Sequence, residues 1–490
     1  MQMPMAFSVL WLLQLFLLTE KVIGTNFARG EEQLEALLAT ETQLIDELRD
    51  YIERLELQLE EIRRETSAIE EIHSQVVDVE KYMGNPLNVL GILKRFDSVW
   101  PKLEQQANET LLINSEQASS DKDLILPSEE DYEESLNQLL HLQSVYELDS
   151  NSLSLGMVNG LKLGSAMSWG DCLEVARKSD FSVARFWLES ALEKLPAASE
   201  NSTEAQRERE SGRVHILEAA LNIEYRAGEL SRALATAEEL LLLLPMNQNI
   251  QKAKRKIEKA MAKKELPKGR HTKSKTKKTK SAEQMLIEEL CRGATQKSTT
   301  GSRFSHCKLE GNTPWLLLQP SRLEPLSSDP YIVLHHDVLS PKEIAQLLEL
   351  IDEEEDDTNG VRSYEPLKLS KMGQKKLKRI NYRLGLKTGD LDPWTGRRHG
   401  HGHSTKLEDS SQLGNVARVM LNLQPPGMGG AVVFPQLELG VNVPRGSLLH
   451  WHTRSAGGSS FSSSEWDYRS GQAVCPVLLG VQLSAWTGLQ

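Results

Sequence analysis

Apolar residues recur at alternating intervals of three and four between residues 34 and 76, and this spacing constrains the fold more than any other feature of the chain. The centre of the seam consists of Ile45, Leu48, Ile52, Leu55, Leu59 and Ile62. A heptad pattern of this kind, flanked by Glu and Arg, is typical of a long helix with a coiled-coil face. It predicts self-association through residues 30–80, although an amphipathic helix packed within its own domain would show the same spacing.

A second helical region is expected between residues 165 and 262. Residues 171–195 favour a pair of short helices, and residues 214–244 favour a hairpin that turns at Ala227 and Gly228. Small alanines at helix crossings and a glycine between two helices are what a tetratricopeptide hairpin needs. Units of this type form concave grooves that bind peptides.

Charge is distributed unevenly along the chain. The formal net charge is -12, which argues against general nucleic-acid binding. Residues 251–280 nevertheless hold fourteen Lys and Arg against only Glu258 and Glu265, a local charge of +12. The end of this stretch has no apolar face, so we interpret residues 263–302 as a solvated linker. A role in binding an anionic partner is the alternative.

The last third of the chain changes to short β-prone runs separated by Gly, Pro and Ser. Examples are YIVLHHDVL from residue 331 and VARVMLNL from residue 416. Short strands with turns every 8–12 residues predict an antiparallel sandwich or barrel.

The N-terminus contains an apolar run of 14 residues, from residue 5 to residue 18. This run is too short to span a bilayer and lies where a secretory signal belongs, so we expect a signal peptide over residues 1–24. A buried N-terminal helix is the alternative. No other window reaches 18 apolar residues, and therefore no membrane span is expected.

Histidines gather at two places in the β-rich region. His399, His401 and His403 alternate with glycines, and on a strand they would project from one face. His450 and His452 would share a face of a second strand. Imidazole is a common ligand for transition metals, so both a metal site and incidental polar strand residues remain open.

Several segments, in order along the chain, resemble the α subunit of collagen prolyl 4-hydroxylase. The segments are NPLNVLGILKRFDSVW (85–100), the hairpin at Asp171 and Cys172, LCRG (290–293), YIVLHHDVLSPKEI (331–344), GGAVVFPQ (429–436) and DYRSGQAVCPVLLG (467–480). The resemblance implies a multidomain α plus β chain. Its parts are a helical coiled-coil dimerisation domain (25–150), a tetratricopeptide-like peptide-substrate domain (151–262), the Lys-rich linker (263–302) and a C-terminal double-stranded β-helix, or jelly-roll, 2-oxoglutarate dioxygenase-like domain (303–490).

The same resemblance implies Fe(II), 2-oxoglutarate and ascorbate as cofactors. It also implies the endoplasmic reticulum lumen as the location. The implied partners are protein disulfide isomerase as β subunit, other α subunits and a proline-rich, procollagen-like peptide. In the peptide domain, the expected contacts fall on Phe181 and Tyr225. The implied disulfide joins Cys291 to Cys307 and leaves Cys475 as a free thiol.

Most catalytic residues of the family are replaced at the matching positions of this sequence. The family binds iron through a His-x-Asp pair and a distal His, and anchors 2-oxoglutarate through a Lys. The resemblance places these on His403, Thr405, Gln472 and Gln482, so only the first is retained. His399, His401, His450 and His452 are possible accessory ligands. We therefore expect a lost or crippled dioxygenase that acts as a binding or assembly subunit. The alternative is an active procollagen-proline 4-dioxygenase with unorthodox ligands.

Overall fold

The computed structural model describes residues 31–107, 127–196, 203–265, 281–296, 307–311, 314–355, 367–384, 393–401, 407–408, 416–454 and 467–489. The predicted signal peptide lies outside them. Contacts divide the chain into two compact units. One comprises residues 1–77 and 102–111, and the other comprises residues 78–101 and 112–490. Within the part that is described, no helix combines the length and the apolar character needed to span a bilayer.

The first unit is dominated by α2 (Glu31–Ser74), a single helix of 44 residues. The predicted apolar seam lies on this helix, and its members are exposed: Leu48 by 60%, Ile52 by 52% and Leu59 by 52%. Lys102 and Gln106, from the second segment of the unit, donate to the carboxylate of Glu61. The central seam is thus not packed against the rest of its own unit.

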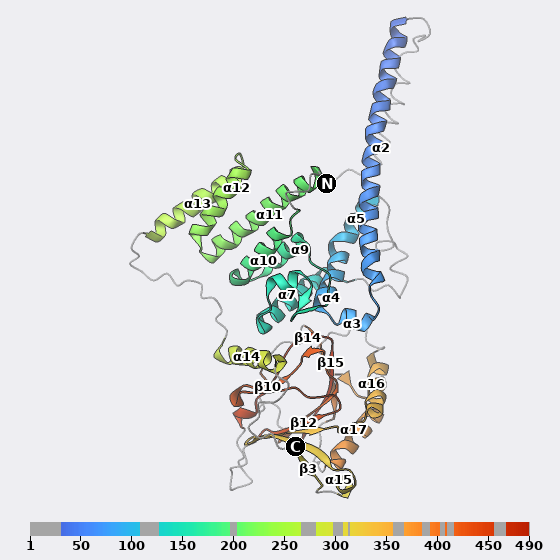
Figure 1. Ribbon diagram of the computed structural model, residues 1–490, viewed down its shortest axis with the longest axis vertical. Helices are drawn as coiled ribbons and strands as arrows, with labels where there is room; N and C mark the ends of the chain where they lie inside the picture. Colours follow the sequence, from blue (N-terminus) through green and yellow to red (C-terminus); the bar gives the residue numbers. More distant parts are fainter. Residues whose placement is uncertain are drawn as a thin grey trace. The chain divides into compact units, whose positions relative to one another are not determined.

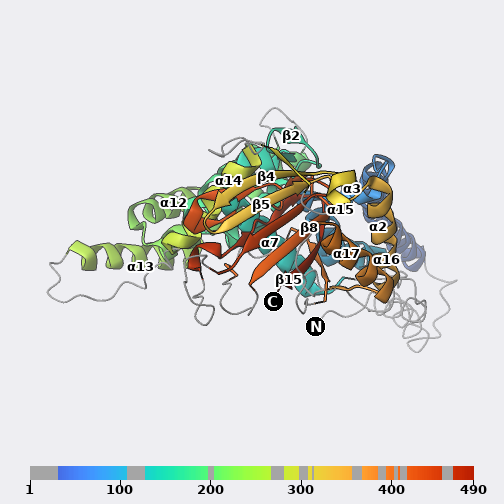
Figure 2. The same ribbon diagram turned by 90° about the horizontal axis from the view of Figure 1, so that it is seen from below.

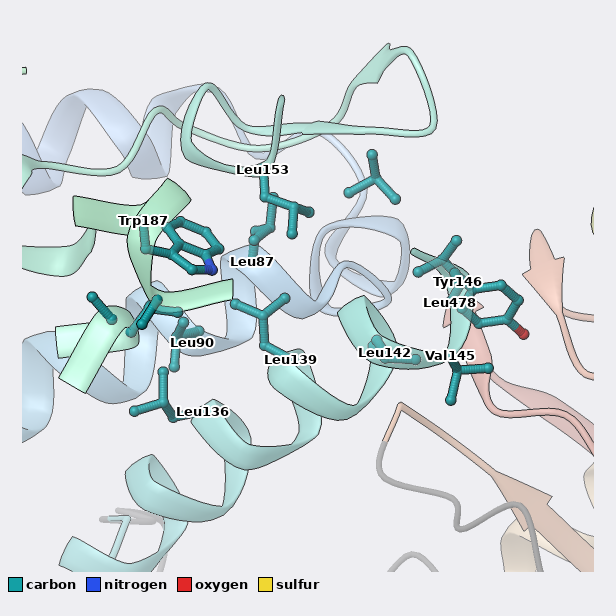
Figure 3. Close-up of a cluster of buried hydrophobic side chains, with 14 of the residues drawn as sticks. Leu87, Leu90, Leu136, Leu139, Leu142, Val145, Tyr146, Leu153, Trp187 and Leu478 are labelled. Carbon is teal, nitrogen blue, oxygen red and sulfur yellow. The ribbon is translucent and has the colours of Figure 1, made fainter. Parts of the chain in front are cut away.

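The second unit begins with short helices around one long one. These are α3 (Val79–Met83), α4 (Pro86–Lys94), the π-helix η1 (Arg95–Val99), the start of α5 (Trp100–Ala107), α7 (Glu129–Tyr146) and α8 (Ser150–Ser154). Figure 3 shows Leu136 and Leu139 of α7 facing Leu87 and Leu90 of α4, with the indole of Trp187 beside them. The Trp187 Nε1 donates to Gln143 Oε1 at 3.0 Å, which satisfies the buried indole.

Both predicted helix pairs are confirmed. The first is α9 (Trp169–Lys178) with α10 (Phe181–Glu193), and the second is α11 (Thr203–Ala227) with α12 (Leu230–Leu243), followed by α13 (Gln248–Glu265). Gly228 makes the turn with φ of 83°, a conformation that side chains rarely adopt. Ala233 and Ala237 are fully buried in the cluster that joins α11, α12 and α13. Figure 1 shows these helices side by side.

The expected linker over residues 263–302 is interrupted by a helix, α14 (Ala282–Gln296). Ile287 and Cys291 are one helical turn apart on its buried face and belong to the same apolar cluster as α7. The predicted boundary at residue 150 does not separate compact units either. Tyr146 at the end of α7 donates to Pro476 O at 2.6 Å, and Gly480 N donates to Gly84 O at 2.7 Å. Figure 3 shows Tyr146 next to Leu478.

The predicted Cys291–Cys307 disulfide is wrong. Cys291 is bonded to Cys475, with a Cα–Cα distance of 5.6 Å, and both residues are completely buried. Cys307 is an exposed free thiol at the start of β3, and Cys172 is a buried one. The reason is that the buried face of α14 and Cys475, which directly follows β13, belong to the same apolar cluster. Cys307 instead precedes β3, an edge strand of the large sheet.

The β-rich region forms a large antiparallel sheet, which is consistent with the prediction for this part of the chain. Its largest sheet has eight strands in the order β3-β4-β5-β12-β8-β15-β7-β6, and every pair is antiparallel. These strands are β3 (Lys308–Glu310), β4 (Ser321–Ser328), β5 (Tyr331–His336), β12 (Leu448–His452), β8 (Ala417–Gln424), β15 (Gln482–Leu489), β7 (Thr395–His399) and β6 (Leu367–Lys368).

Smaller sheets and helices complete the region. One small sheet joins β11 (Leu439–Val441), β10 (Val432–Phe434) and β13 (Ala473–Val474), and another joins β14 (Val477–Leu479) and β9 (Met428–Gly429). The remaining elements are β1 (Met157–Val158), β2 (Leu161–Lys162), α15 (Pro314–Leu318), α16 (Pro341–Glu355), α17 (Lys371–Arg383), η3 (Pro435–Leu437) and η4 (Tyr468–Ser470).

The eight-stranded sheet therefore has two chemically different faces. Its inner face packs on the β10–β11–β13 sheet through Phe434, Trp451 and Trp486. Its outer face is covered by α16 and α17, whose Leu347 and Leu377 pack against Val419 and Leu421 of β8. Figure 2 shows both helices beside β8 and β15. Because side chains alternate along a strand, each residue of these strands can be assigned to one face.

Candidate functional site

The end of β7 and the start of β15 bring two of the candidate residues together. Gln482 pairs with His399 across the two strands, and both are buried, at 1% and 3% exposure. Gln482 and Trp486 are four residues apart on β15, so Gln482 and His399 lie on the inner face with Trp486. His403 and Thr405 lie outside the described residues. His401 follows the strand in a turn, where its Nδ1 lies 3.2 Å from Val477 O.

His450 and His452 share one face of β12, as predicted, but it is the outer face. Trp451 between them belongs to the inner core. Two strands, β8 and β15, separate β12 from β7. At about 4.8 Å per strand, His450 and His399 are roughly 14 Å apart along the sheet as well as on opposite faces. His399 and His450 therefore do not face one common site, and no single metal ion could bind both.

Gln472 belongs to a network of partly buried charges centred on Glu408. The two residues form an antiparallel bridge, and Gln472 Nε2 donates to Glu408 Oε2 at 3.0 Å. Arg418 Nη1 donates to the same oxygen at 2.8 Å, and Arg397 Nη1 donates to Glu408 Oε1 at 2.8 Å. Burial alone would raise the pKa of Glu408, but the two guanidinium groups outweigh burial and hold that pKa below its usual value.

Aromatic rings support this network from inside the sheet. The guanidinium of Arg397 lies 4.5 Å from the ring centre of Trp486, and that of Arg418 lies 5.3 Å from the same ring. Arg418 is only 4% exposed, so its charge depends on Glu408 for compensation. The sequence contained no direct indication of Glu408 as a functional residue. Arg418 is a lone charge within the apolar run VARVMLNL, and a charge in a buried strand requires an acidic partner, so Arg418 was the signal for such a residue.

Gln482 lies at the wall of a pocket of about 220 Å³. Asn422, Asn442, Val443 and the segment from Pro425 to Gly430 complete its lining. Gln482 Nε2 donates to Gly430 O at 3.1 Å. Among the residues that the structure describes, no Lys, Arg or His side chain belongs to this lining. The pocket therefore offers no counter-ion for a negatively charged ligand.

The two residues expected to bind peptide differ in their exposure to solvent. Phe181 begins α10 and packs partly buried against the helical core. Tyr225 lies near the end of α11 and is 38% exposed. Only Tyr225 thus presents a substantial aromatic surface.

Known proteins resemble this chain over most of its length. The model described as "Prolyl 4-Hydroxylase alpha-subunit, N-terminal region" matches residues 31–160. Prolyl 4-hydroxylase subunit alpha-1 from Homo sapiens is 26% identical over 513 residues, covering 95% of this chain and 93% of its own length. Subunit alpha-2 from Caenorhabditis elegans is 25% identical and covers 92% and 88%. This similarity over nearly the whole chain is what a divergent relative of the prolyl 4-hydroxylase α subunits would show.

Solved structures add a weaker likeness. The viral collagen prolyl hydroxylase of Paramecium Bursaria Chlorella virus-1, in a 2OG complex, is 16% identical and covers 32% of this chain and 93% of its own. The TM-score is 0.26, which by itself supports no assignment.

The described residues of this chain do not fit Fe(II) and 2-oxoglutarate. Gln472 directs its amide nitrogen to Glu408, and the Glu408 carboxylate is already engaged by two guanidinium groups, whose positive charge opposes a nearby metal ion. Among the residues described, no group of three or more His, Cys, Asp or Glu is placed to hold a metal. The pocket beside Gln482 lacks the cation that a dicarboxylate requires.

The outer-face histidines predict a pH dependence. The rings of His335 and His450 lie 6.5 Å apart, and burial lowers their pKa values to about 4 and about 3. In the unfolded chain, both imidazoles should titrate near pH 6.5. Between that pH and the lowered pKa values, the unfolded chain therefore binds protons that the folded protein does not bind. We expect stability to fall as the pH drops below about 6.5, by up to about 1.4 kcal/mol per pH unit for each histidine.

Thermal unfolding midpoints at pH 7 and pH 5 would measure this loss. The variant His450→Gln removes one titrating ring and should show a smaller fall between the two pH values. An equal fall in the variant and the unaltered chain would contradict the assignment to His450.

Proposed function

We propose that this chain is an α-subunit-like protein of the endoplasmic reticulum lumen that lacks dioxygenase turnover and acts as a binding and assembly subunit. The observation that carries the proposal is the Glu408 network. The residue expected at the distal ligand position, Gln472, serves to complete an ion cluster of Glu408, Arg397 and Arg418.

The chemistry of the replaced positions supports the same conclusion. A Thr hydroxyl at position 405 supplies no charge to iron, and an amide at position 472 is a weak donor. Substituting residues that hydrogen-bond to the metal ligands typically lowers metal affinity or activity by about 10–100-fold. Loss of two of the ligands themselves should lower them further. Gln482 in place of Lys leaves a bound carboxylate without its counter-ion, a loss of roughly 2–5 kcal/mol.

The binding role rests on features that the chain retains. The exposed seam of α2 suits a second helix, from another copy of this chain or from another α subunit. The helix pairs α9–α10 and α11–α12 resemble tetratricopeptide units, and exposed Tyr225 could contact a proline-rich peptide. The relatives are named as subunits, which motivates protein disulfide isomerase as the partner.

The test uses the full chain, co-expressed and purified with protein disulfide isomerase. We expect no peptide-dependent succinate release above background with Fe(II), 2-oxoglutarate, ascorbate and a proline-rich peptide. Turnover that disappears in the variant His403→Ala would overturn the proposal and support an active 2-oxoglutarate dioxygenase.

The mass of the same preparation tests assembly. We expect more than one copy of this chain in the complex, reduced to one by the paired changes Leu48→Glu and Leu55→Glu in the seam. Gln43→Glu adds one negative charge on α2 away from the seam and should leave the mass unchanged. A single copy in the unaltered complex would refute self-association through α2.

A further inference from the structure

The helix α13, which lies beside α12 (Figure 1), presents a row of cations to solvent. Its apolar face is buried against α12, where Ile250 is 4% and Ile257 is 1% exposed. A helix turns once in 3.6 residues, so positions three and four apart share a face. On the side opposite the buried face, this spacing collects exposed basic side chains, which we call the basic row: Lys252, Arg255, Lys256 and Lys259.

The basic row is not used to hold the fold together. The neighbouring Lys254 donates to Glu238 of α12 at 2.9 Å, and Glu258 interacts with Lys254 from one turn further along α13. Within the part of the chain that the structure describes, no side chain of the row forms an ion pair or a hydrogen bond. Like charges four residues apart on a helix repel each other. An anion lying along the row would therefore stabilise α13.

The surroundings of the row strengthen its positive potential. Residues 251–280 carry a local charge of +12 in a chain whose net charge is -12. The helix α17 offers a comparison, because its exposed Lys375 and Lys378 also lie one turn apart. However, α17 lies beside α16, whose sequence ends in acidic residues at 352–355. Charges of one sign add to a common potential, so the potential should be highest along α13.

The form of the row favours a linear polyanion over an acidic protein surface. From Lys252 to Lys259 the row is straight and about 10 Å long, so it can follow a single polymer strand. Exposed ion pairs between proteins stabilise weakly, and the row contains no aromatic or apolar anchor of the kind that protein interfaces use. A polymer of high charge density gains instead from the release of its condensed counter-ions.

Nucleic acids and membranes fit the row less well. Proteins that bind single-stranded nucleic acids stack the bases on aromatic rings, and residues 251–280 contain no Phe, Tyr or Trp. An amphipathic helix on a membrane inserts its apolar face, but that face of α13 is covered by α12. In the secretory pathway, sulfated polymers are the other source of dense negative charge. This last step rests on the location given under the proposed function.

We propose that the basic row of α13 binds a sulfated polysaccharide of the glycosaminoglycan type. Sulfate groups along the polymer accept charge-assisted hydrogen bonds from the lysines and the arginine, and their charge removes the repulsion within the row. The affinity should fall as the salt concentration rises, because added salt opposes the release of counter-ions.

The test measures the binding of a heparin dodecasaccharide to the full chain by calorimetry at several salt concentrations. The paired changes Lys256→Gln and Lys259→Gln should weaken binding by about tenfold and reduce the slope of log affinity against log salt by roughly 1–2. Lys375→Gln with Lys378→Gln removes the same charge at the same spacing from α17 and should leave the affinity nearly unchanged. An equal loss in both paired variants would show that heparin responds only to total charge, which would overturn the proposal.

Two further probes, a DNA oligonucleotide and a polyglutamate peptide of similar charge, decide the class of partner. We expect heparin to bind more tightly than either. Tighter binding of DNA or of polyglutamate, or no binding of heparin at about 0.15 M salt, would refute a polysaccharide site. This comparison uses the unaltered chain, so it decides the question even if a variant fails to fold. No iron, 2-oxoglutarate or substrate peptide is present, so failure here is distinct from a finding of dioxygenase activity.

Discussion

Replacing Cys475 by Ala is expected to lower the free energy of unfolding by roughly 3–5 kcal/mol. The bond from Cys291 to Cys475 closes a loop with a sequence separation of 184 residues, and long loops lose the most entropy in the unfolded chain when they are cross-linked. Both cysteines are completely buried, so the substitution also leaves a gap between α14 and the segment that follows β13.

Cys307→Ala is the matched control. Cys307 is exposed and unbonded, so its removal should change stability little. Chemical denaturation followed by tryptophan fluorescence measures both variants, and peptide mapping without reductant identifies the bonded pair. A loss of stability in Cys307→Ala with none in Cys475→Ala would restore the Cys291–Cys307 pairing that the sequence suggested.

Glu408→Gln is expected to cost about 3 kcal/mol, the second large effect. The change leaves the charge of Arg418 without compensation, and the Arg418 side chain is only 5% exposed. Breaking a buried ion pair by removing one partner typically costs about 3–5 kcal/mol. We take the lower end because 37% of the Glu408 side chain is exposed and water screens it in part.

A surface pair provides the control for Glu408. Arg322 and Asp337 are 3.1 Å apart but 69% and 71% exposed, so Asp337→Asn should have little effect. Asn also tolerates the φ of 52° at this position. The double change Glu408→Leu with Arg418→Met should recover part of the loss, because an apolar set can replace buried charges. If Glu408→Gln is as mild as Asp337→Asn, the network does not stabilise the sheet.

Expectations based on local periodicity agreed best with the structure. The seam from Ile45 to Ile62 is helical within α2, and the turn at Gly228 joins two helices. The apolar runs from residues 331 and 416 became β5 and β8. The hydrophobic periodicity of a helix or a strand involves residues close together in the chain, so it can be recognised from a single sequence.

Expectations that required distant contacts agreed less well. Spacing alone could not show that α14 would turn Cys291 toward Cys475, and family resemblance suggested a different pair. His399 and His450 were each correctly expected on a strand. The strand order puts two strands between them, and their positions in the alternating pleat put them on opposite faces of the sheet. Strand order is set by the whole core, and it leaves no local mark in the sequence.

The sequence by itself determined the helical and β-rich parts, the family resemblance and the replacement of residues at 405, 472 and 482. Only the tertiary structure decided what the replacements do. It joins Gln472 to Glu408 and places Gln482 at a pocket without a cation. The physical reason is that a buried charge or amide takes its role from the groups that surround it, and those groups come from segments far apart in the chain.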